Sequence, residues 1–520
     1  MARVLITEEL AATGLDALSS AGHEVDVQLG LSPADLLVAI KGAEALIVRS
    51  ATKVTADVLA AGDQLAVVGR AGVGIDNIDV AEATRRGVMV VNAPQSNSLS
   101  NAEHTVALLL AQARNIPQAD AALKAGRWER SRWEGVELHG KTLGLLGLGR
   151  VGTLVAQRAN SFGMRIVAWD PWTSPDRARK MGVELLELDE LIGRVDFLSI
   201  HLLKTAESVG LVGAELLAKA KPGLRIVNTA RGGIVDEAAL AAAIAAGQVA
   251  GAAIDVFAEE PTTASPLFER PEVVVTPHLG ASTREAQDKA GEQIAEQVVL
   301  ALGGEFVPFA VNVSAHEASE TVRPFVPLAE RLGQLFAGLL GSIPDVLEVE
   351  YQGAIADFDV SLATLSVLRG VLGTSTGEPV SFVNAPGVAA ERGLEVKEIK
   401  VTTAHDHLNL LTLRAGDRSI AGTLTGVRGE PRIVAVDAIN VEVPPARHML
   451  VVRNDDRVGM LAKVFTTLAD ASINVADSHL GRVPGGAAII VIATDSAVPV
   501  EVIAALGATP GILTVHALAG

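Results

Sequence analysis

Short apolar runs alternate with helix-like stretches over the first part of the chain. Four of these runs read as β-strands, and apolar residues recur at helical spacing between them. The four predicted strands are residues 4–7, 45–50, 65–72 and 88–94. This β/α alternation is typical of a parallel sheet with helices on its faces.

A second series of apolar runs begins at Lys141, after an Ala/Leu-rich helix predicted over residues 101–113. Six strands with helices between them are predicted, which is the strand count of a complete dinucleotide-binding domain. These strands are residues 142–149, 165–170, 196–202, 224–230, 252–257 and 273–279. A long helix follows from about Arg284 to Leu302. We expect it to cross back toward the first sheet, which makes the first domain discontinuous.

The chain beyond this helix has a weaker pattern. Residues 303–313 read as a connector, and residues 314–446 contain strand-like patterns such as 401–415 but few chemically suggestive side chains. The sequence predicts only an α/β or α+β domain there.

The last ~75 residues show a clearer alternation of strand and helix periods, in the order βαββαβ. The predicted elements are the strand 448–454, the helix 459–470, the strands 473–482 and 486–494, the helix 500–506 and the strand 512–518. On the first helix, one face carries Leu461, Val464, Phe465 and Leu468. We expect a small sandwich with free faces and edges that favour ligand binding or pairing with another tail.

With 520 residues the chain is too long for one hydrophobic core, so several domains are expected. The pattern predicts a substrate domain (1–97 plus 284–310), a cofactor domain (98–283), an intervening domain (311–446) and a C-terminal domain (447–520). Hydrophobic residues make up 49% of the chain and aromatic residues only 3%, a mixture that suits close packing of helices on sheets and argues against disorder.

The formal charge of −18 makes nucleic acid and anionic membranes unsuitable partners. An anionic substrate would therefore need a local cationic pocket. The absence of cysteine excludes disulfides and thiolate metal ligands, and it fits a reducing compartment. The first residues, MARVLITEEL, read as a strand rather than a signal peptide, and no apolar run reaches the ~20 residues of a membrane span. We expect a cytoplasmic protein without a metal site.

One glycine-rich motif stands where a dinucleotide would bind. Gly147, Gly149 and Gly152 form a GxGxxG that follows an apolar strand and opens a helix. In that context the glycines permit a tight turn and the approach of a pyrophosphate to the helix N-terminus. Asp170 ends the next strand, where it can accept hydrogen bonds from the ribose diol and repel a 2′-phosphate. The motif therefore predicts NAD rather than NADP.

Three polar residues follow strand ends of the same predicted sheet, namely Arg231, Asp255 and His278, and Glu260 lies on the loop after Asp255. Ligands bind at the carboxyl ends of parallel strands, so these side chains should converge on the cofactor crevice. A histidine can exchange the proton of a hydroxyl that is oxidised by hydride transfer. A neighbouring carboxylate would raise the histidine pKa and fix its tautomer, and an arginine can grip a carboxylate.

Six segments together resemble the D-2-hydroxyacid dehydrogenase family, and they cover about the first 310 residues in the family's order. They are VGRAGVGIDNID (68–79), NAPQSNSLSNAEH (92–104), GLLGLGRVG (144–152), NTARGGIVDEAAL (228–240), DVFAEEP (255–261) and TPHLGAST (276–283). The similarity is greatest to the long bacterial members that oxidise phosphoglycerate. It implies a Rossmann-type cofactor domain inserted in a flavodoxin-like substrate domain, followed by an intervening domain and a C-terminal ACT domain.

The resemblance also implies roles for particular residues. Arg231, Glu260 and His278 would be catalytic, with His278 as proton donor and acceptor. The substrate would be lined by Arg49, Val73, Gly74 and Asn97, with Arg49 facing an anionic group. Beyond the glycines of the motif, NAD would contact Val73, Arg150, Val151, Asp170, Leu202, Thr229, Ala230, Arg231, Asp255, His278, Leu279, Gly280 and Ala281.

The tail resembles an ACT domain in its element order, in residues 456–459 and in residues 473–475. In this family the pattern implies that L-serine binds between two tails through Asp456 and Asn474, within a homodimer or homotetramer. Two features depart from the family's pattern. Val458 stands where proline is common, and residues 441–448 lack a dense basic cluster. A dimerisation module without a ligand is the alternative.

The predicted reaction is the oxidation of 3-phospho-D-glycerate to 3-phosphohydroxypyruvate with NAD, the first step of L-serine biosynthesis. One alternative is another dehydrogenase of the family, acting on glyoxylate or hydroxypyruvate, although the extension beyond the core disfavours it. A NAD-sensing corepressor or scaffold on the same fold is the alternative from another class.

Overall fold

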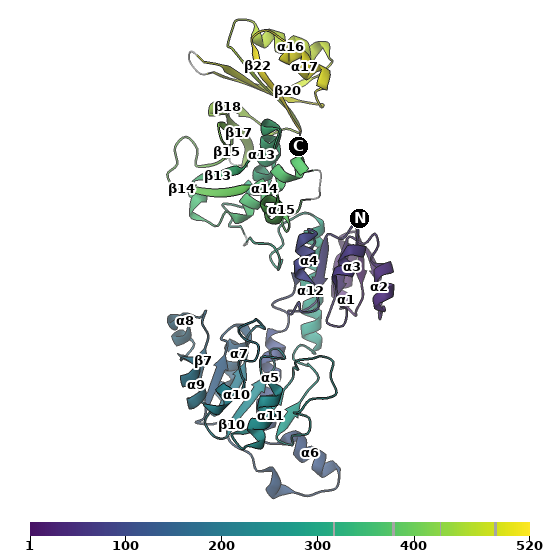
Figure 1. Ribbon diagram of the computed structural model, residues 1–520, viewed down its shortest axis with the longest axis vertical. Helices are drawn as coiled ribbons and strands as arrows, with labels where there is room; N and C mark the ends of the chain where they lie inside the picture. The colour runs from purple at the N-terminus through teal and green to yellow at the C-terminus, as the bar shows by residue number, and fades with distance from the viewer. Residues whose placement is uncertain (316–317, 377–379, 427, 483–485, 520) are drawn as a thin grey trace.

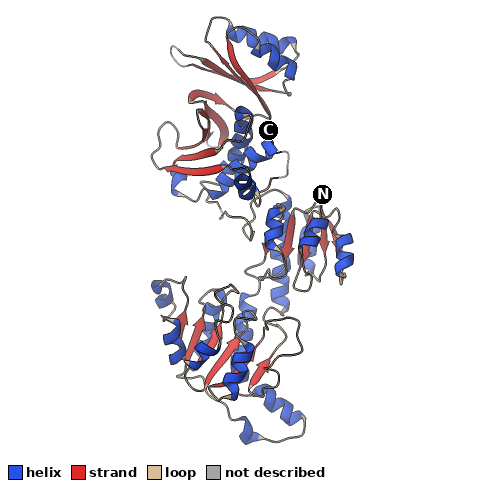
Figure 2. Cartoon of the chain, in the orientation of Figure 1, coloured by secondary structure: helices blue, strands red, loops and turns tan. Residues whose placement is uncertain are grey.

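The computed structural model describes residues 1–520 except 316–317, 377–379, 427, 483–485 and 520. It contains four β-sheets, which follow one another along the longest axis of the molecule (Figure 1). The cofactor sheet lies at one end and the sheet of the C-terminal tail at the other, with helices covering the sheets throughout (Figure 2). Among the described helices, none is long and apolar enough to cross a bilayer.

The first sheet is parallel and has the strand order β2-β1-β3-β4-β5. Its strands are β1 (Arg3–Ile6), β2 (Glu24–Val27), β3 (Ala45–Val48), β4 (Val67–Arg70) and β5 (Met89–Asn92). Four of the five strands were predicted, whereas β2 was not. β2 is an edge strand with no buried residue, so it lacks the apolar run that marks the others.

Helices cover both faces of this sheet because alternate strand residues point to opposite sides. One face packs on α1 (Ala12–Ser20) and α12 (Arg284–Leu302), and the other packs on α2 (Pro33–Ala39), α3 (Ala56–Ala61) and α4 (Val80–Arg85). Ile294 and Val298 of α12 are fully buried in the first of these cores. The long helix therefore does return to the first sheet (Figure 1).

The second sheet is also parallel, with the order β12-β11-β10-β9-β6-β7-β8. This is the order of a dinucleotide-binding fold, in which the first strand, β6, stands at the point where the order reverses. Its strands are β6 (Thr142–Leu146), β7 (Arg165–Trp169), β8 (Glu184–Leu185), β9 (Phe197–Ile200), β10 (Leu224–Asn228), β11 (Val249–Ile254) and β12 (Val273–Val275). The six predicted strands are present, and the two-residue edge strand β8 was missed because it is too short to show a period.

The helices around this sheet complete the Rossmann-type arrangement expected from the sequence. They are α5 (Ser98–Ala113), α6 (Ile116–Lys124), the 3-10 turn η1 (Arg130–Trp133), α7 (Arg150–Ser161), α8 (Pro175–Lys180), α9 (Leu188–Arg194), α10 (Ala214–Ala218) and α11 (Glu237–Ala245). α5 and α7 lie on one face of the sheet, and α9, α10 and α11 lie on the other.

The third sheet is mixed, with the order β14-β13-β15-β16-β17-β18, and only the β13–β14 pair is parallel. Its strands are β13 (Val346–Gly353), β14 (Glu395–Val401), β15 (Asn409–Ala415), β16 (Arg418–Thr425), β17 (Glu430–Val436) and β18 (Ile439–Val443), and its helical elements are α13 (Phe325–Leu340), η2 (Ala354–Asp357), α14 (Ser361–Thr376) and α15 (Ala385–Glu391). The single strand-like pattern over 401–415 is in fact the end of β14, a polar loop and β15.

The tail has the expected βαββαβ order and forms the sheet β20-β21-β19-β22. Its elements are β19 (His448–Asn454), α16 (Met460–Asp470), β20 (Val475–Arg482), β21 (Ala488–Thr494), α17 (Val500–Gly507) and β22 (Ile512–Ala519). The buried face of α16 is formed by Met460, Val464 and Leu468, whereas Leu461 is exposed. The helix begins at Met460, and its stripe is rotated from the predicted one.

The expectation that the tail sheet has a free face is wrong. Met449, Val451, Ile489, Val491 and Leu518 of that sheet are buried in the same core as the intervening helices and strands. Alternate residues of β19 and β21 face that core, and their neighbours face α16 and α17. The tail and the intervening region therefore share one hydrophobic core.

Candidate active site

The glycine-rich turn after β6 has a separate steric reason for each glycine. Gly147 has a φ of +97°, and a Cβ there would lie 2.6 Å from the carbonyl oxygen of His201. A Cβ at Gly152 would collide with the carbonyl oxygen of Gly147, so this glycine lets α7 pack against the turn. At Gly149 a Cβ would meet nothing within 4 Å, which leaves the backbone open to a ligand. This geometry fits a bound pyrophosphate.

Asp170 follows β7 and holds the glycine-rich turn in place. Its Oδ2 accepts a hydrogen bond from Leu148 N at 2.7 Å, and its Oδ1 accepts from Trp172 N at 2.8 Å and Thr173 N at 3.0 Å. A carboxylate offers about four lone-pair sites, so one remains for a ribose hydroxyl. Gly147, Gly149, Asp170 and Leu202 line one cavity of about 650 Å³, as expected for the cofactor site.

The other expected cofactor contacts lie around this cavity or at the neighbouring strand ends. Arg150 and Val151 form the first turn of α7, and the Arg150 guanidinium donates to Pro94 O at 3.0 Å. Thr229 and Ala230 follow β10 and are buried. Val73 lies in the loop after β4, where its carbonyl accepts from Asn92 Nδ2 at 2.7 Å.

His278 and Glu260 form a hydrogen-bonded pair in the crevice between the first two sheets. His278 Nδ1 lies 2.6 Å from Glu260 Oε2, and Glu260 Oε1 accepts from Phe257 N at 2.9 Å. Burial acts to raise the pKa of Glu260, but the hydrogen bonds from His278 and Phe257 N outweigh it and hold the pKa below its usual value. An ionised carboxylate can only accept, so Nδ1 donates and Nε2 is free to exchange a proton.

Arg231 lies at the end of β10 and reaches toward the first sheet. Its Nε is 3.3 Å from Asp76 Oδ2, and its terminal nitrogen occupies the space that a Cβ on Gly74 would need. Gly74 is therefore a glycine because the guanidinium packs against its backbone. Arg231 and Gly74, both predicted from the sequence, are brought together.

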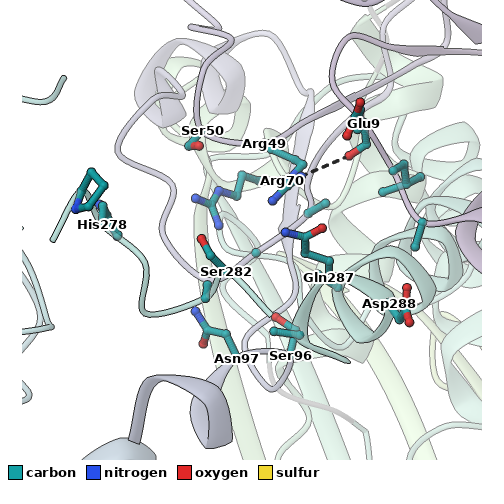
Figure 3. Close-up of a pocket in the computed structure, with 18 residues that line it drawn as sticks. Glu9, Arg49, Ser50, Arg70, Ser96, Asn97, His278, Ser282, Gln287 and Asp288 are labelled. Carbon is teal, nitrogen blue, oxygen red and sulfur yellow. Dashed lines mark hydrogen bonds between the residues drawn. The ribbon is translucent and has the colours of Figure 1, made fainter. Parts of the chain in front are cut away.

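A polar cavity of about 330 Å³ separates the two catalytic sheets, and Figure 3 shows its lining. Arg49, Asn97, His278 and Ala281 line it, and the first two are residues that were expected to contact the substrate. Glu8 fixes the loop of Arg49 by accepting hydrogen bonds from the backbone N–H groups of residues 49, 51 and 52. Arg49 and Asn97 therefore face the same space as His278.

Arg70 also lines this cavity and was missed by the sequence analysis. Burial lowers its pKa to about 10, and the positive charges of Arg231 and Arg49 act in the same direction, against Glu8 and Asp76. Its buried Nε has no hydrogen-bond partner among the residues that the structure describes. The available signal was its place at the carboxyl end of β4, since Arg231 was selected because it follows the carboxyl end of β10. Arg49 and Arg70 thus line a cavity together with His278, and the charge of Arg231 acts on Arg70 from nearby, an arrangement that favours a polyanionic ligand.

A second cavity, of about 470 Å³, adjoins the other side of the His278–Glu260 pair. It is lined by apolar side chains such as Phe257 and Phe268, whose rings meet edge to face at 5.2 Å. The polar and apolar cavities share Ser50, Pro277 and His278. The imidazole therefore stands between a cationic space and an apolar one.

Asp456 and Asn474, the expected serine contacts, do not lie close together within one chain. Asn454 and Arg482 both pair with Ala488 of β21, whereas His448 and Val475 both pair with Thr494. β19 and β20 are therefore parallel, because α16 carries the chain back along the sheet, and the two residues lie at opposite ends. Asp456 forms an ion pair with Arg482 at 2.6 Å, and Asn474 Nδ2 donates to Asp495 at 2.5 Å.

Comparison with known proteins places the chain in a family. Residues 106–280 match the model of the D-isomer specific 2-hydroxyacid dehydrogenase NAD binding domain, residues 321–437 match the D-3-phosphoglycerate dehydrogenase intervening domain, and residues 448–511 match the ACT domain. Among solved structures, the TT0316 protein of Thermus thermophilus is 36% identical, with a TM-score of 0.56 over 59% of this chain and 99% of that one.

An NAD-dependent formate dehydrogenase from Staphylococcus aureus, solved in complex with NAD, is 29% identical, with a TM-score of 0.54 over 59% of this chain and 97% of its own. Fold and site together define an NAD-dependent dehydrogenase whose tail is an ACT domain.

Full-length relatives narrow the class. The D-3-phosphoglycerate dehydrogenase of Mycobacterium bovis is 48% identical over 97% of each chain, and that of Bacillus subtilis is 38% identical over 99% of each. The chain belongs to the D-3-phosphoglycerate dehydrogenase family, in the long form with an intervening domain and an ACT domain.

Proposed function

We propose that the protein oxidises 3-phospho-D-glycerate to 3-phosphohydroxypyruvate with NAD, the first step of L-serine biosynthesis. The observation that carries the proposal is the cationic cavity that Arg49 and Arg70 line together with His278, with the charge of Arg231 acting on Arg70 from nearby. The substrate carries a phosphate and a carboxylate, and three guanidinium groups match that charge. An uncharged end group, as in glyoxylate or hydroxypyruvate, would leave part of the cluster without a partner.

The acid–base step belongs to His278. Its Nε2 accepts the proton of the substrate's C2 hydroxyl while the hydride leaves C2, and in the reverse direction the imidazolium returns that proton to the carbonyl oxygen. Glu260 stabilises the imidazolium and keeps the proton of Nδ1 in place. Arg231 orients the carboxylate that adjoins C2, and its neighbour Asp76 limits the side chain to one direction.

The chain's own residues hold the cofactor, which supplies the hydride acceptor when bound. The turn from Gly147 to Gly152 receives the pyrophosphate, and the remaining acceptor site of Asp170 selects the unmodified ribose. These role assignments, and the division into domains 1–97 plus 284–310, 98–283, 311–446 and 447–520, are part of the proposal. A corepressor or scaffold would have no use for the paired His278 and Glu260.

L-serine is the proposed effector, bound where two tails of a homo-oligomer meet. Since Asp456 and Asn474 lie at opposite ends of the sheet, a site using both requires Asp456 from one chain and Asn474 from another. An antiparallel pairing of two tails along their β20 edges would bring the Asp456 end of one sheet to the Asn474 end of the other, and would do so twice. Serine would then favour one arrangement of the subunits over another, which is a coupling of typically ~1–3 kcal/mol.

The acid–base assignment is tested by His278→Ala. Loss of a positioned general base typically costs ~10²–10⁴-fold in turnover, whereas NADH binding should change little because the glycine-rich turn is elsewhere. His139→Ala, at an exposed histidine outside the crevice, is the matched control and should leave turnover unchanged. Turnover of His278→Ala within a few-fold of wild type would refute the proposed role.

A further inference from the structure

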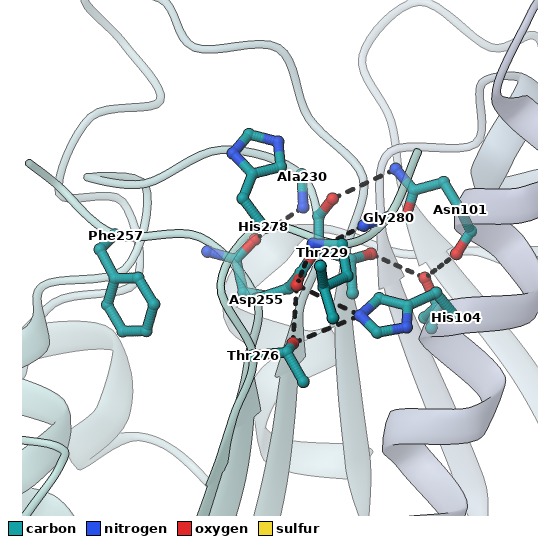
Figure 4. A network of polar contacts seen from close by, with 12 residues as sticks. Asn101, His104, Thr229, Ala230, Asp255, Phe257, Thr276, His278 and Gly280 are labelled. Atoms are coloured by element: carbon teal, nitrogen blue, oxygen red, sulfur yellow. Dashed lines mark hydrogen bonds and ion pairs between the residues drawn. The ribbon is translucent and has the colours of Figure 1, made fainter. Parts of the chain in front are cut away.

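Helix α5 presents a polar face to the carboxyl ends of β10, β11 and β12. Asn101, His104 and Thr105 share this face because they are three and four residues apart. Asn101 Nδ2 donates to Thr229 O at 3.2 Å, and the hydroxyls of Thr105 and Thr229 are 2.7 Å apart. Figure 4 shows the His104 imidazole directed at a buried carboxylate, that of Asp255. His104 has no role in the proposed reaction so far.

The carboxylate of Asp255 is fully buried and gathers donors from several segments. His104 Nε2 lies 3.2 Å from its Oδ1, and the hydroxyl of Thr276 donates to the same oxygen at 2.6 Å. Leu279 N donates at 2.7 Å and Gly280 N at 2.9 Å. A buried carboxylate is stable only when such donors replace water, so Asp255 requires this set.

The donors from residues 276, 279 and 280 lie on either side of His278, which has a strained backbone. Its φ is +54°, a left-handed conformation that costs a side chain such as His of order ~1–3 kcal/mol and persists only where the surroundings impose it. His278 N also donates to Asp255 O at 2.8 Å. The turn that carries the imidazole is thus wound around Asp255.

We propose that His104 is a positioning residue for His278, acting through Asp255 and the hydrogen bonds that fix the turn of residues 276–280. Among the described groups that donate to the Asp255 carboxylate, His104 is the only one that belongs to α5. The same helix begins directly after Asn97 of the substrate cavity. His104 therefore connects the helix that borders the substrate to the turn that holds the base. The inference rests on the proposed role of His278.

The titratable groups that face Asp255 decide how the interaction depends on pH. They are the His104 imidazole from α5 and the Glu260 carboxylate, which pairs with His278, from the adjoining loops. Burial acts to raise the pKa of Asp255, but hydrogen bonds from His104, Thr276 and Leu279 N lower it below its usual value. Removing His104 should let this pKa rise, so the turn would be released at a higher pH than in the wild type.

The experiment compares His104→Ala, His104→Gln and His139→Gln in the full-length enzyme, with His278→Ala measured alongside. The amide of Gln can donate to Asp255 in place of the imidazole, and His139 is an exposed control. For His104→Ala we expect kcat to fall roughly tenfold or more, because misplacement of a reacting group by about 1 Å costs up to ~10²-fold. The KM for phosphoglycerate and the Kd for NADH should stay within about twofold.

The pH dependence of kcat gives a second readout. In His104→Ala its acid limb should move to higher pH. His104→Gln should recover most of the kcat that His104→Ala loses.

Three results would overturn the inference. They are a kcat of His104→Ala within about twofold of wild type, a loss of NADH affinity in parallel with kcat, and a His104→Gln variant as impaired as His104→Ala. Each leaves the proposed function standing if His278→Ala is inactive. If His278→Ala keeps its turnover, the proposed function itself fails, whatever the His104 variants do.

Discussion

At the scale of single residues, the site combines groups that the sequence marked and groups that only the structure reveals. His278 and Glu260 were predicted from their places after strands, and the structure pairs them at 2.6 Å. Arg70 and His104 were missed, although both stand in motifs that were recognised. The reason is that their importance depends on contacts across sheets, and the spacing of residues in one segment does not encode such contacts.

Arg70 is expected to determine affinity for the anionic substrate. Arg70→Gln removes a charge-assisted contact worth about 1.5–3 kcal/mol, so the KM for phosphoglycerate should rise roughly 10–100-fold with a smaller change in kcat. Arg70→Lys should recover only part of the loss, because an ammonium lacks the fork of the guanidinium. Steady-state kinetics with separate titration of each substrate measures this. A KM unchanged in Arg70→Gln would exclude the residue from the anion site.

At the scale of elements, the sequence predicted the strands with long apolar runs and failed at the edges. β2 has no buried residue and β8 spans two residues, so neither shows a hydrophobic period. The polar loop between β14 and β15 interrupted a pattern that looked continuous. The distance between Asp456 and Asn474 depends on the direction of β20. Because α16 carries the chain back along the sheet, β20 runs parallel to β19 and the two residues lie at opposite ends, which no local motif indicates.

Asp170, which directly follows β7, should determine the preference for NAD over NADP. Asp170→Ser removes the carboxylate that repels a 2′-phosphate, so the ratio of kcat/KM with NADP to that with NAD should rise. Use of NAD should also weaken, because Asp170 anchors Leu148 N of the glycine-rich turn. Kinetics with both cofactors tests this expectation. Equal use of NADP and NAD by the wild type would contradict it.

His201, which directly follows β9, should make the free energy of unfolding depend on pH. Burial lowers the pKa of His201 to about 3, and its Nε2 is 2.8 Å from Ser199 Oγ. Between the ordinary histidine value of 6.5 and about 3, the unfolded chain binds a proton that the folded chain does not. The free energy of unfolding therefore falls as the pH falls through this window, and the contribution is complete above it.

Urea unfolding measured at about pH 7 and about pH 5 tests this dependence. Over that range His201 gains a proton in the unfolded chain but stays neutral in the folded chain. His201→Asn should lose less stability between the two values than the wild type, and the exposed control His139→Asn should lose as much as the wild type. Equal losses in all three proteins would show that His201 is not held neutral.

At the scale of the whole molecule, the tail and the intervening region share a core, the cofactor sheet stands at the other end, and the first sheet lies between them (Figure 1). Val383 extends from the intervening region into the core of the first sheet, while its neighbour Phe382 stays in the intervening core. Ser381 Oγ also donates to Gly87 O at 3.0 Å. A change in how the tails pair therefore has a packed route toward the substrate-binding sheet.

The proposed serine site makes a prediction about mixed oligomers. Asp456→Ala and Asn474→Ala should each lose serine inhibition, because each variant lacks one half of every site. Co-refolded mixtures of the two should regain part of it, since a hybrid pair contains one site with both residues intact. Wild type mixed with either variant is the control. A site built from two chains would be contradicted if the mixture of the two variants regained no serine inhibition while the mixtures that contain wild type did.

The central claim is that the cationic cavity beside His278 serves a phosphorylated hydroxy acid. The most direct measurement is NADH formation by the wild-type protein with 3-phospho-D-glycerate and, in parallel, with D-glycerate, which differs only by the phosphate. We expect a kcat/KM at least about 100-fold higher for the phosphorylated substrate, because its phosphate engages the arginine cluster. Equal rates with both substrates, or turnover of D-glycerate alone, would contradict it.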